Sequence, residues 1–272
     1  AMGFEAHSVP YDHTGAVDLD ALEKLITPDT RLICCMQVNN ETGAIQPLSE
    51  IAALRARRAP EAHFHVDGVQ GFLRVPFDMP GVQADSYALS GHKIHGPKGI
   101  GALILAPGVR VHPRALGGGQ ESGLRSGTEN TPGIAGLLAA VEAYPLENGM
   151  RQVKLHLWQR LREAIPDAAV NGPAPDSDLA APHILNVSLP PVRSETMLHA
   201  LEGAGIYVGM GSACSSHKQK VSAVLRAMNT PQRLAESALR FSLCPENTLA
   251  EMEQVAAACG QNYAVLSKFQ RR

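Results

Sequence analysis

Long hydrophobic runs and blocks of one charge are missing from this sequence, and each absence excludes a class of protein. No apolar stretch in the 272 residues approaches the roughly 20 residues that cross a bilayer, so a membrane-spanning protein is not expected. Lysine and arginine number 24 against 26 aspartates and glutamates, for a net charge of -2. Basic residues gather only at 55–58 and 271–272, and such short clusters fit solvated helix faces. Nucleic acid is therefore not an expected partner.

The five cysteines lack the even number and regular spacing of a disulfide framework. From its first residues we expect no signal peptide. Free thiols in a reducing compartment are the simpler interpretation, so we expect a cytoplasmic protein. Cys34 and Cys35 lie inside an apolar run of strand length, where we predict both to be small core residues.

The length of the chain and its hydrophobic patterning predict two domains. Between residues 31 and 106, strand-length apolar runs alternate with a helical pattern at 47–58, which predicts an α/β domain with a mostly parallel sheet. Proline, asparagine and glycine interrupt the pattern at 145–149. We therefore expect a large domain over 1–147 and a smaller α+β domain over 148–272. Strands in the smaller domain are predicted at 184–189, 206–208 and 238–243.

Polar residues follow several predicted strands of the large domain. Ligands of parallel α/β sheets bind at the carboxyl ends of strands, and Asn40, Asp67 and the turn from Ser90 to Lys93 fall at such ends. A lysine held in a pocket becomes a nucleophilic amine. Pyridoxal phosphate needs such a lysine to hold its aldehyde, and an aspartate to keep its pyridine nitrogen protonated. The pattern therefore indicates a pyridoxal phosphate site.

Two other patterns leave alternatives open. His63, His65 and Asp67 alternate along one strand and so share a face, which would suit a metal ion with two histidine ligands and one carboxylate. Ligands about 7 Å apart on one straight strand converge poorly, so we expect no metal. The glycine run 117–119 either cradles a phosphate with its backbone N–H groups or is a surface connection.

Cys214 and Arg240 stand out in the second domain. Cys214 follows a glycine-rich turn and precedes His217, Lys218 and Lys220, a setting that favours a reactive thiolate, although a buried small residue fits the same pattern. Arg240 lies in an apolar strand and needs a partner there. That partner is either a carboxylate ligand or a structural salt bridge.

The sequence resembles the cysteine desulfurases, which are fold-type I pyridoxal phosphate enzymes of the class-V aminotransferase group. Six motifs occur in the family's order over about residues 15 to 243, which is a specific match. They are Val38-Asn39-Asn40-Glu41-Thr42-Gly43, His65-Val66-Asp67-Gly68-Val69-Gln70, Ser90-Gly91-His92-Lys93-Ile94-His95-Gly96-Pro97-Lys98-Gly99, Gly117-Gly118-Gly119-Gln120-Glu121-Ser122-Gly123-Leu124-Arg125-Ser126-Gly127-Thr128-Glu129-Asn130, Gly211-Ser212-Ala213-Cys214-Ser215-Ser216 and Leu239-Arg240-Phe241-Ser242-Leu243.

The resemblance implies roles for individual residues around the cofactor. Lys93 would bind the aldehyde and move the substrate's α-proton, and His92 would belong with it to the catalytic set. Asp67 would support the electron sink, and Gln70 would hydrogen-bond the cofactor's phenolic oxygen. Ser90 and His92 are similar to the family's phosphate ligands.

Further roles concern the substrate and the partners. Asn40 would lie near the cofactor and the substrate, and Arg240 would bind the substrate's α-carboxylate. Cys214 matches the cysteine that takes up sulfur from L-cysteine as a persulfide and passes it to an acceptor protein. Thr128 looks like the residue that reaches the phosphate in the neighbouring subunit, which implies a homodimer.

The sequence departs from the family at its start. Members are usually longer, and the phosphate-binding Gly-Thr turn and the ring-stacking histidine of the family have no counterpart in residues 1–29. We therefore expect a fragment, half of a split enzyme or a degenerate homologue that needs a partner segment. The alternatives in activity are a related lyase that acts on selenocysteine and a non-catalytic scaffold subunit.

Overall fold

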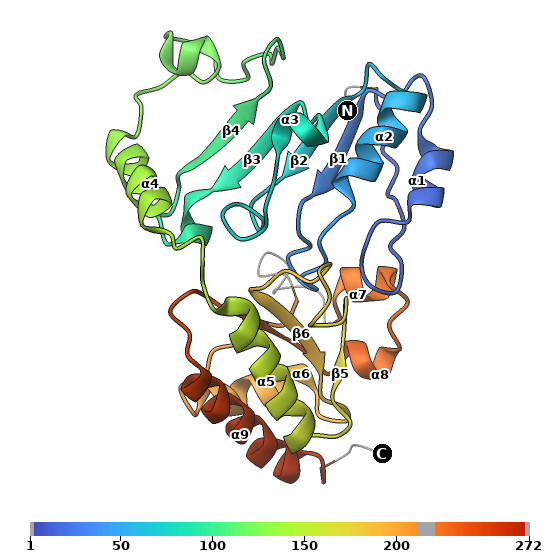
Figure 1. The fold of residues 1–272 in the computed structure, drawn as a ribbon, viewed down its shortest axis with the longest axis vertical. Coiled ribbons are helices and arrows are strands. Elements are labelled where there is room, and N and C mark those ends of the chain that lie inside the picture. Colours follow the sequence, from blue (N-terminus) through green and yellow to red (C-terminus); the bar gives the residue numbers. More distant parts are fainter. Residues whose placement is uncertain (1–2, 212–220, 270–272) are drawn as a thin grey trace. The chain divides into compact units, whose positions relative to one another are not determined.

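The computed structural model describes residues 3–211 and 221–269, and it forms two units (Figure 1). Unit 1 consists of Ala1–Leu25, Val38–Pro47 and Glu147–Arg272, and unit 2 of Ile26–Gln37 and Leu48–Leu146. The predicted domains, 1–147 and 148–272, stay a prediction. By contacts, the early segments 1–25 and 38–47 cluster with the C-terminal residues, so each unit is built from separate stretches of chain.

Unit 2 is a four-stranded sheet in the order β1-β2-β3-β4. The first three strands are parallel and the fourth runs antiparallel to β3, which confirms the predicted mostly parallel sheet. Its strands are β1 (Leu32–Met36), β2 (His63–Asp67), β3 (Ser86–Ser90) and β4 (Gly101–Leu105). Its helices are α2 (Leu48–Arg58), α3 (Met79–Val82), the 3-10 turns η1 (Gly91–Ile94) and η2 (Gln120–Gly123), and α4 (Thr131–Ala143).

The two faces of this sheet differ in burial. Alternate residues of a strand point to opposite faces. Phe64 and Val66 of β2 are fully buried, whereas Leu32 of β1 is 58% exposed and Leu103 of β4 is 54% exposed. Cys34 lies between Leu32 and Met36 on the exposed face of β1.

The prediction that both cysteines of β1 lie in the core is therefore wrong for Cys34. An apolar strand suggested burial on both faces, but here only the face of Ile33 is buried. Cys35 is partly buried, and burial raises the pKa of its thiol to about 12, so it is no nucleophile at neutral pH.

Unit 1 is an antiparallel sheet with helices packed on it. Its strands are β5 (Ala169–Val170), β6 (Ile184–Ser188) and β7 (Ala238–Ser242). Its helices are α1 (Leu19–Leu25), α5 (Met150–Ala164), α6 (Ser194–Glu202), α7 (Ala223–Ala227), α8 (Gln232–Ala235) and α9 (Leu249–Leu266). Helix α5 packs along α9, and both contribute to one core with β6 and β7 (Figure 1). No helix among the described residues is apolar over a length that would cross a bilayer.

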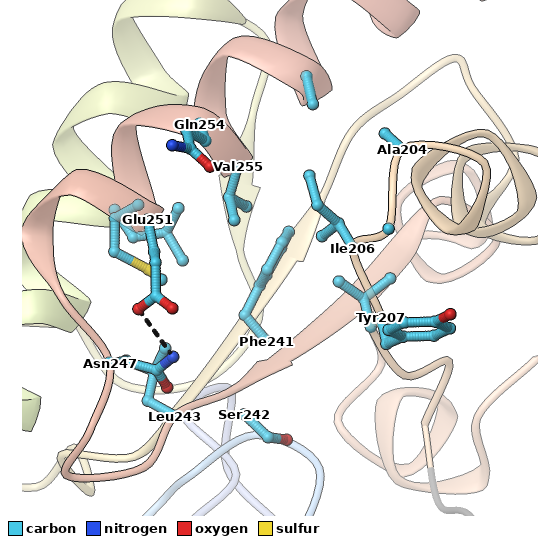
Figure 2. Close-up of a pocket in the computed structure, with 15 residues that line it drawn as sticks. Ala204, Ile206, Tyr207, Phe241, Ser242, Leu243, Asn247, Glu251, Gln254 and Val255 are labelled. Atoms are coloured by element: carbon cyan, nitrogen blue, oxygen red, sulfur yellow. Dashed lines mark hydrogen bonds between the residues drawn. The ribbon is translucent and has the colours of Figure 1, made fainter.

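The predicted strand at 206–208 does not form. Gly209 pairs with Arg240 of β7, but the chain before it turns away to meet the end of α6, where the Ile206 N–H donates to the Leu201 carbonyl at 2.9 Å. The resulting gap is a pocket of about 420 Å³ (Figure 2). Ile206 and Phe241 contribute apolar side chains to its lining. Ile206 and Val208 thus pack against the core of unit 1 without pairing as a strand.

Lys154 of α5 is fully buried in unit 1. Its Nζ donates to the Ala181 carbonyl at 2.8 Å, and Ala181 in turn donates its N–H to the Gly43 carbonyl at 2.8 Å. Burial lowers the pKa of this lysine to about 8, and the nearby Arg151 adds to the effect. Lys154 therefore holds, through Ala181, the segment 38–47 that contains Asn40.

We expect the stability of the protein to rise between pH 8 and pH 10.5 through Lys154. Over that range the unfolded state binds more protons than the folded state, because the lysine's pKa is about 8 when folded and 10.5 as a model value. The full contribution is about 3 kcal/mol, since one pKa unit is about 1.36 kcal/mol. Denaturant unfolding of the wild type and of Lys154→Met across this range measures it. A stability difference between them that does not change with pH would contradict this linkage.

Candidate active site

The proposed cofactor lysine of unit 2 lies on a tight turn directly after β3. Lys93 belongs to η1, which begins as β3 ends at Ser90. The turn is closed by hydrogen bonds from Gly91 N–H to the Ile100 carbonyl and from Gly96 N–H to the Gly91 carbonyl, each 2.9 Å. The Arg74 guanidinium donates to the Lys93 carbonyl, so the backbone of the lysine is fixed from outside the turn as well.

Asp67 ends the neighbouring strand. In the register of β2 and β3 it lies opposite Ala88, two residues before Ser90, so both site segments leave the same edge of the sheet. Its Oδ1 accepts from the Val69 N–H at 2.9 Å, which orients the carboxylate within the turn that also carries Gln70. A Cβ on Gly68 would lie 1.8 Å from the Tyr87 ring, so this turn needs glycine to lie so close to β3.

Tyr87 of β3 packs against the turn at Gly68. Its hydroxyl donates to Gln37 Oε1 at 2.8 Å. Burial, together with the negative charge of Asp67, raises the pKa of Tyr87, which therefore stays protonated and a hydrogen-bond donor. The sequence offered no sign of this contact, because Gln37 and Tyr87 are 50 residues apart.

Ser90 and His92 are brought together. Ser90 Oγ lies 2.7 Å from His92 Nδ1. Burial lowers the pKa of His92, and the charges of Lys93, Lys98 and Arg74 lower it further, so the ring is held toward its neutral form. A hydroxyl and a neutral imidazole are both groups that donate hydrogen bonds to a phosphate.

Two sequence patterns left alternatives open: the histidines of β2, as possible metal ligands, and the glycine run 117–119, as a possible phosphate loop. The Ser86 hydroxyl lies 2.7 Å from His63 Nε2 and 2.8 Å from His65 Nδ1, so each ring places one nitrogen on a serine rather than toward a shared ion. The glycine run at 117–119 is exposed, and so is Thr128, which lies between η2 and α4.

The proposed substrate-binding residues lie in unit 1. Arg240 Nη1 donates to the carbonyl oxygens of Asn40 at 2.9 Å and Gly211 at 3.0 Å, and its Nε donates to Ser242 Oγ at 3.1 Å. Burial lowers the pKa of Arg240, while the carboxylate of Glu41 favours the charged form. Within residues 3–211 and 221–269, no carboxylate lies at ion-pair distance from Arg240, which disfavours a structural salt bridge.

Cys214 lies outside the described residues, between Gly211 and Val221. In the other two cysteines of unit 1, Cys244 and Cys259, burial disfavours the thiolate form. Cys259 is buried, and burial raises its thiol pKa to about 12. Burial also raises the pKa of Cys244.

Sequence reasoning missed Glu41 and Asn186. Asn186 of β6 is buried, and its Nδ2 donates to the Glu41 carbonyl at 3.1 Å, which ties the Asn40 segment to the sheet. The available signal was an asparagine within the apolar run 184–189, because an amide that is buried in a strand needs hydrogen-bond partners.

Comparisons with known proteins identify the family of this chain. The family model "Aminotransferase class-V" matches residues 1–255. The cysteine desulfurase of Nostoc sp. is 40% identical over 93% of this chain and 64% of its own length. The human cysteine desulfurase is 37% identical over 96% of this chain and 57% of its own length. This chain therefore spans less than two thirds of the length of these curated relatives.

Solved structures give the same result. A NifS-like protein superposes with a TM-score of 0.84 at 35% identity, over 98% of this chain and 69% of that one. A NifS-like protein from Rickettsia africae gives a TM-score of 0.82 at 29% identity, over 94% and 69%. These neighbours confirm the α/β architecture of fold-type I enzymes. The match of the family model over nearly the whole sequence shows that this chain belongs to the class-V aminotransferase family.

Proposed function

We propose that this chain carries the site of a pyridoxal phosphate-dependent cysteine desulfurase. The observation that carries the proposal is the edge where β2 and β3 end, with Asp67 on one strand and Ser90, His92 and Lys93 after the other. The names of the similar proteins support the same reaction. Since those proteins are longer than this chain, the activity is proposed for the protein to which the site belongs.

The residues at this edge fit pyridoxal phosphate by the chemistry of their donor set. Lys93 offers an amine for the aldehyde, and Asp67 an oriented carboxylate for the ring nitrogen. The Ser90–His92 pair offers donors for the phosphate. Gln70, on the same turn as Asp67, would hold the ring's hydroxyl oxygen. When bound, the cofactor supplies an aldehyde for the substrate amine and a ring that accepts electrons.

The chain's own residues would then act on L-cysteine. Arg240, held by the carbonyl oxygens of Asn40 and Gly211, would bind the substrate carboxylate, with Asn40 near the substrate. Lys93 Nζ would take the α-proton. The thiolate of Cys214 would attack the substrate sulfur: an S–S bond forms and the C–S bond breaks. The carbon fragment keeps that electron pair, takes up one proton at the β-carbon, regains the α-proton from Lys93 and leaves as alanine.

The direct test is product analysis of the holoenzyme with L-cysteine. We expect alanine and sulfide in equal amounts in the presence of a reducing thiol, and no product from L-serine. Alanine formed from L-selenocysteine but not from L-cysteine would assign the lyase instead. The absence of alanine with either substrate, from protein loaded with cofactor, would reject a desulfurase.

The finer assignments belong to the same proposal. Thr128 is exposed, as a residue that reaches a second subunit must be before assembly, so we propose a homodimer with shared sites. An acceptor protein would receive the persulfide sulfur for iron–sulfur clusters or for thiolated cofactors and tRNA. The four cysteines outside 212–220 are free, in keeping with a reducing cytoplasm.

A further inference from the structure

Arg74 joins three stretches of unit 2 that are far apart in the sequence. It lies in the segment 68–76, which directly follows Asp67 at the end of β2. Its guanidinium donates to the Lys93 carbonyl on η1, and its Nε donates to the Tyr144 hydroxyl, at the end of α4, at 3.2 Å. Through one side chain, the strand end that carries Asp67 is therefore connected to the turn that carries Lys93.

The segment 68–76 is held firmly where Arg74 leaves it. Gln37, which is only 2% exposed, donates from Nε2 to the Val75 carbonyl at 3.1 Å. Leu73, directly before Arg74, has a φ of 59°, in the left-handed region. A leucine takes up this unfavourable backbone only where surrounding contacts impose it, and such positions cluster at functional sites. The base of the Arg74 side chain is therefore fixed.

The guanidinium also brings a positive charge close to the proposed site. Its Nη1 is buried and makes no hydrogen bond within the part of the chain that the structure describes. A buried donor without a partner lowers stability, so packing alone does not explain an arginine here. Burial lowers the pKa of His92, and the charge of Arg74 adds to that effect together with those of Lys93 and Lys98. Arg74 thus acts on the residues around Lys93 by contact and by charge.

We propose that Arg74 is a positioning residue that fixes the backbone of Lys93 relative to Asp67, and so sets the lysine amine where the cofactor's aldehyde lies. This inference rests on the proposed pyridoxal phosphate site. The aldehyde and the ring nitrogen lie at opposite ends of one rigid aromatic ring, so the two groups that bind them must be held at a matching separation. Arg74 acts through the Lys93 carbonyl and touches no reacting atom in this assignment.

The proposal predicts a loss of covalent attachment without a matching loss of ring and phosphate binding. The variant is Arg74→Met, which keeps an extended side chain and removes its donors. We expect pyridoxal 5′-phosphate to attach to Lys93 about tenfold more slowly or worse, the size expected for losing a charge-assisted hydrogen bond. Absorbance and borohydride trapping follow the attachment. Pyridoxine 5′-phosphate, which has a hydroxymethyl group in place of the aldehyde, should lose less than about threefold in affinity.

Two further variants separate positioning from a general structural role. Arg74→Lys keeps a positively charged donor and should recover most of the attachment rate. The matched control is Arg57→Met, which alters an exposed arginine of α2 in the same unit and should have no effect. Equal losses with the two ligands in Arg74→Met would overturn the proposal, as would an unchanged attachment rate.

Amide hydrogen exchange of the protein without cofactor gives a readout that does not depend on the proposed chemistry. The N–H groups of Gly91 and Gly96 close the turn that carries Lys93. Without the Arg74 contact this turn should open more often, so the amides of 91–96 should exchange at least about threefold faster in Arg74→Met, with β1 unchanged. Unchanged exchange at 91–96 would reject the anchoring role. Faster exchange in a protein whose wild type binds no pyridoxal phosphate would support the anchoring contact and reject the proposed cofactor site.

Discussion

Replacing Lys93 with alanine is expected to abolish covalent attachment of pyridoxal phosphate and to lower alanine release from L-cysteine at least a thousandfold. The amine has two tasks in the proposed site, to hold the aldehyde and to move the α-proton. Proton transfer by a positioned side chain alone contributes about 10²–10⁴ in rate. Borohydride reduction followed by peptide mass spectrometry locates the attachment, and a coupled alanine assay gives the rate.

Lys98→Ala is the matched control for this experiment. Lys98 lies on the loop between η1 and β4 and is exposed, whereas Lys93 is half-buried on η1, where Arg74 holds its carbonyl. The control should keep both the reduced adduct and the activity. An adduct that maps to Lys98, or activity that survives in Lys93→Ala, would remove the central residue of the proposed site.

Replacing Cys214 with serine should abolish persulfide and sulfide formation while leaving the cofactor spectrum intact. A serine hydroxyl is not ionised at neutral pH and is a poor nucleophile toward sulfur, so we expect a loss of at least a thousandfold. The residues proposed to hold the cofactor's aldehyde, ring nitrogen and phosphate lie in unit 2, so this change does not alter them. Spectra with and without L-cysteine, together with sulfide release, check both parts.

The fair control for Cys214→Ser is Cys34→Ser. Cys34 is an exposed thiol, so its replacement tests for a non-specific role of accessible thiols without disturbing a core. Cys259 is buried, and a serine there would bring a hydroxyl into the core of unit 1, so reduced activity in that variant requires an unfolding measurement beside it. Equal loss in Cys34→Ser and Cys214→Ser would reject Cys214 as the specific sulfur carrier.

Local patterns predicted those parts of the fold and site that depend on nearby residues. The strand 63–67 that ends in Asp67, the parallel order of β1 to β3 and the turn that carries Lys93 follow from apolar runs and from glycine and proline positions. Helix α9 begins after Thr248, whose side chain forms a capping box with Glu251, and a threonine followed three residues later by a glutamate is a local signal for a helix start.

The parts that failed depend on distant partners. Strand periodicity reports which residues share a face but not whether anything covers it, so the exposure of Cys34 was not predictable. Ile206 and Val208 fit the pattern of a strand. The turn after α6 directs them away from β7, which the chain meets only at Gly209. The Ser222 hydroxyl donates a hydrogen bond to the Glu41 carboxylate 181 residues away, and no pattern within one motif indicates such a pair.

The discontinuity of the two units has a consequence for how the protein is made. Residues 38–47 are synthesised well before Ala181, Asn186 and Arg240, with which several of them form hydrogen bonds. Asn40 and Arg240 are 200 residues apart, and at about 5–20 residues per second this means a wait of roughly 10–40 s between their synthesis. Closing so long a loop is also entropically costly. The segment that bears Asn40 and Glu41 is therefore expected to complete its native contacts only after Arg240 has been synthesised, late in folding.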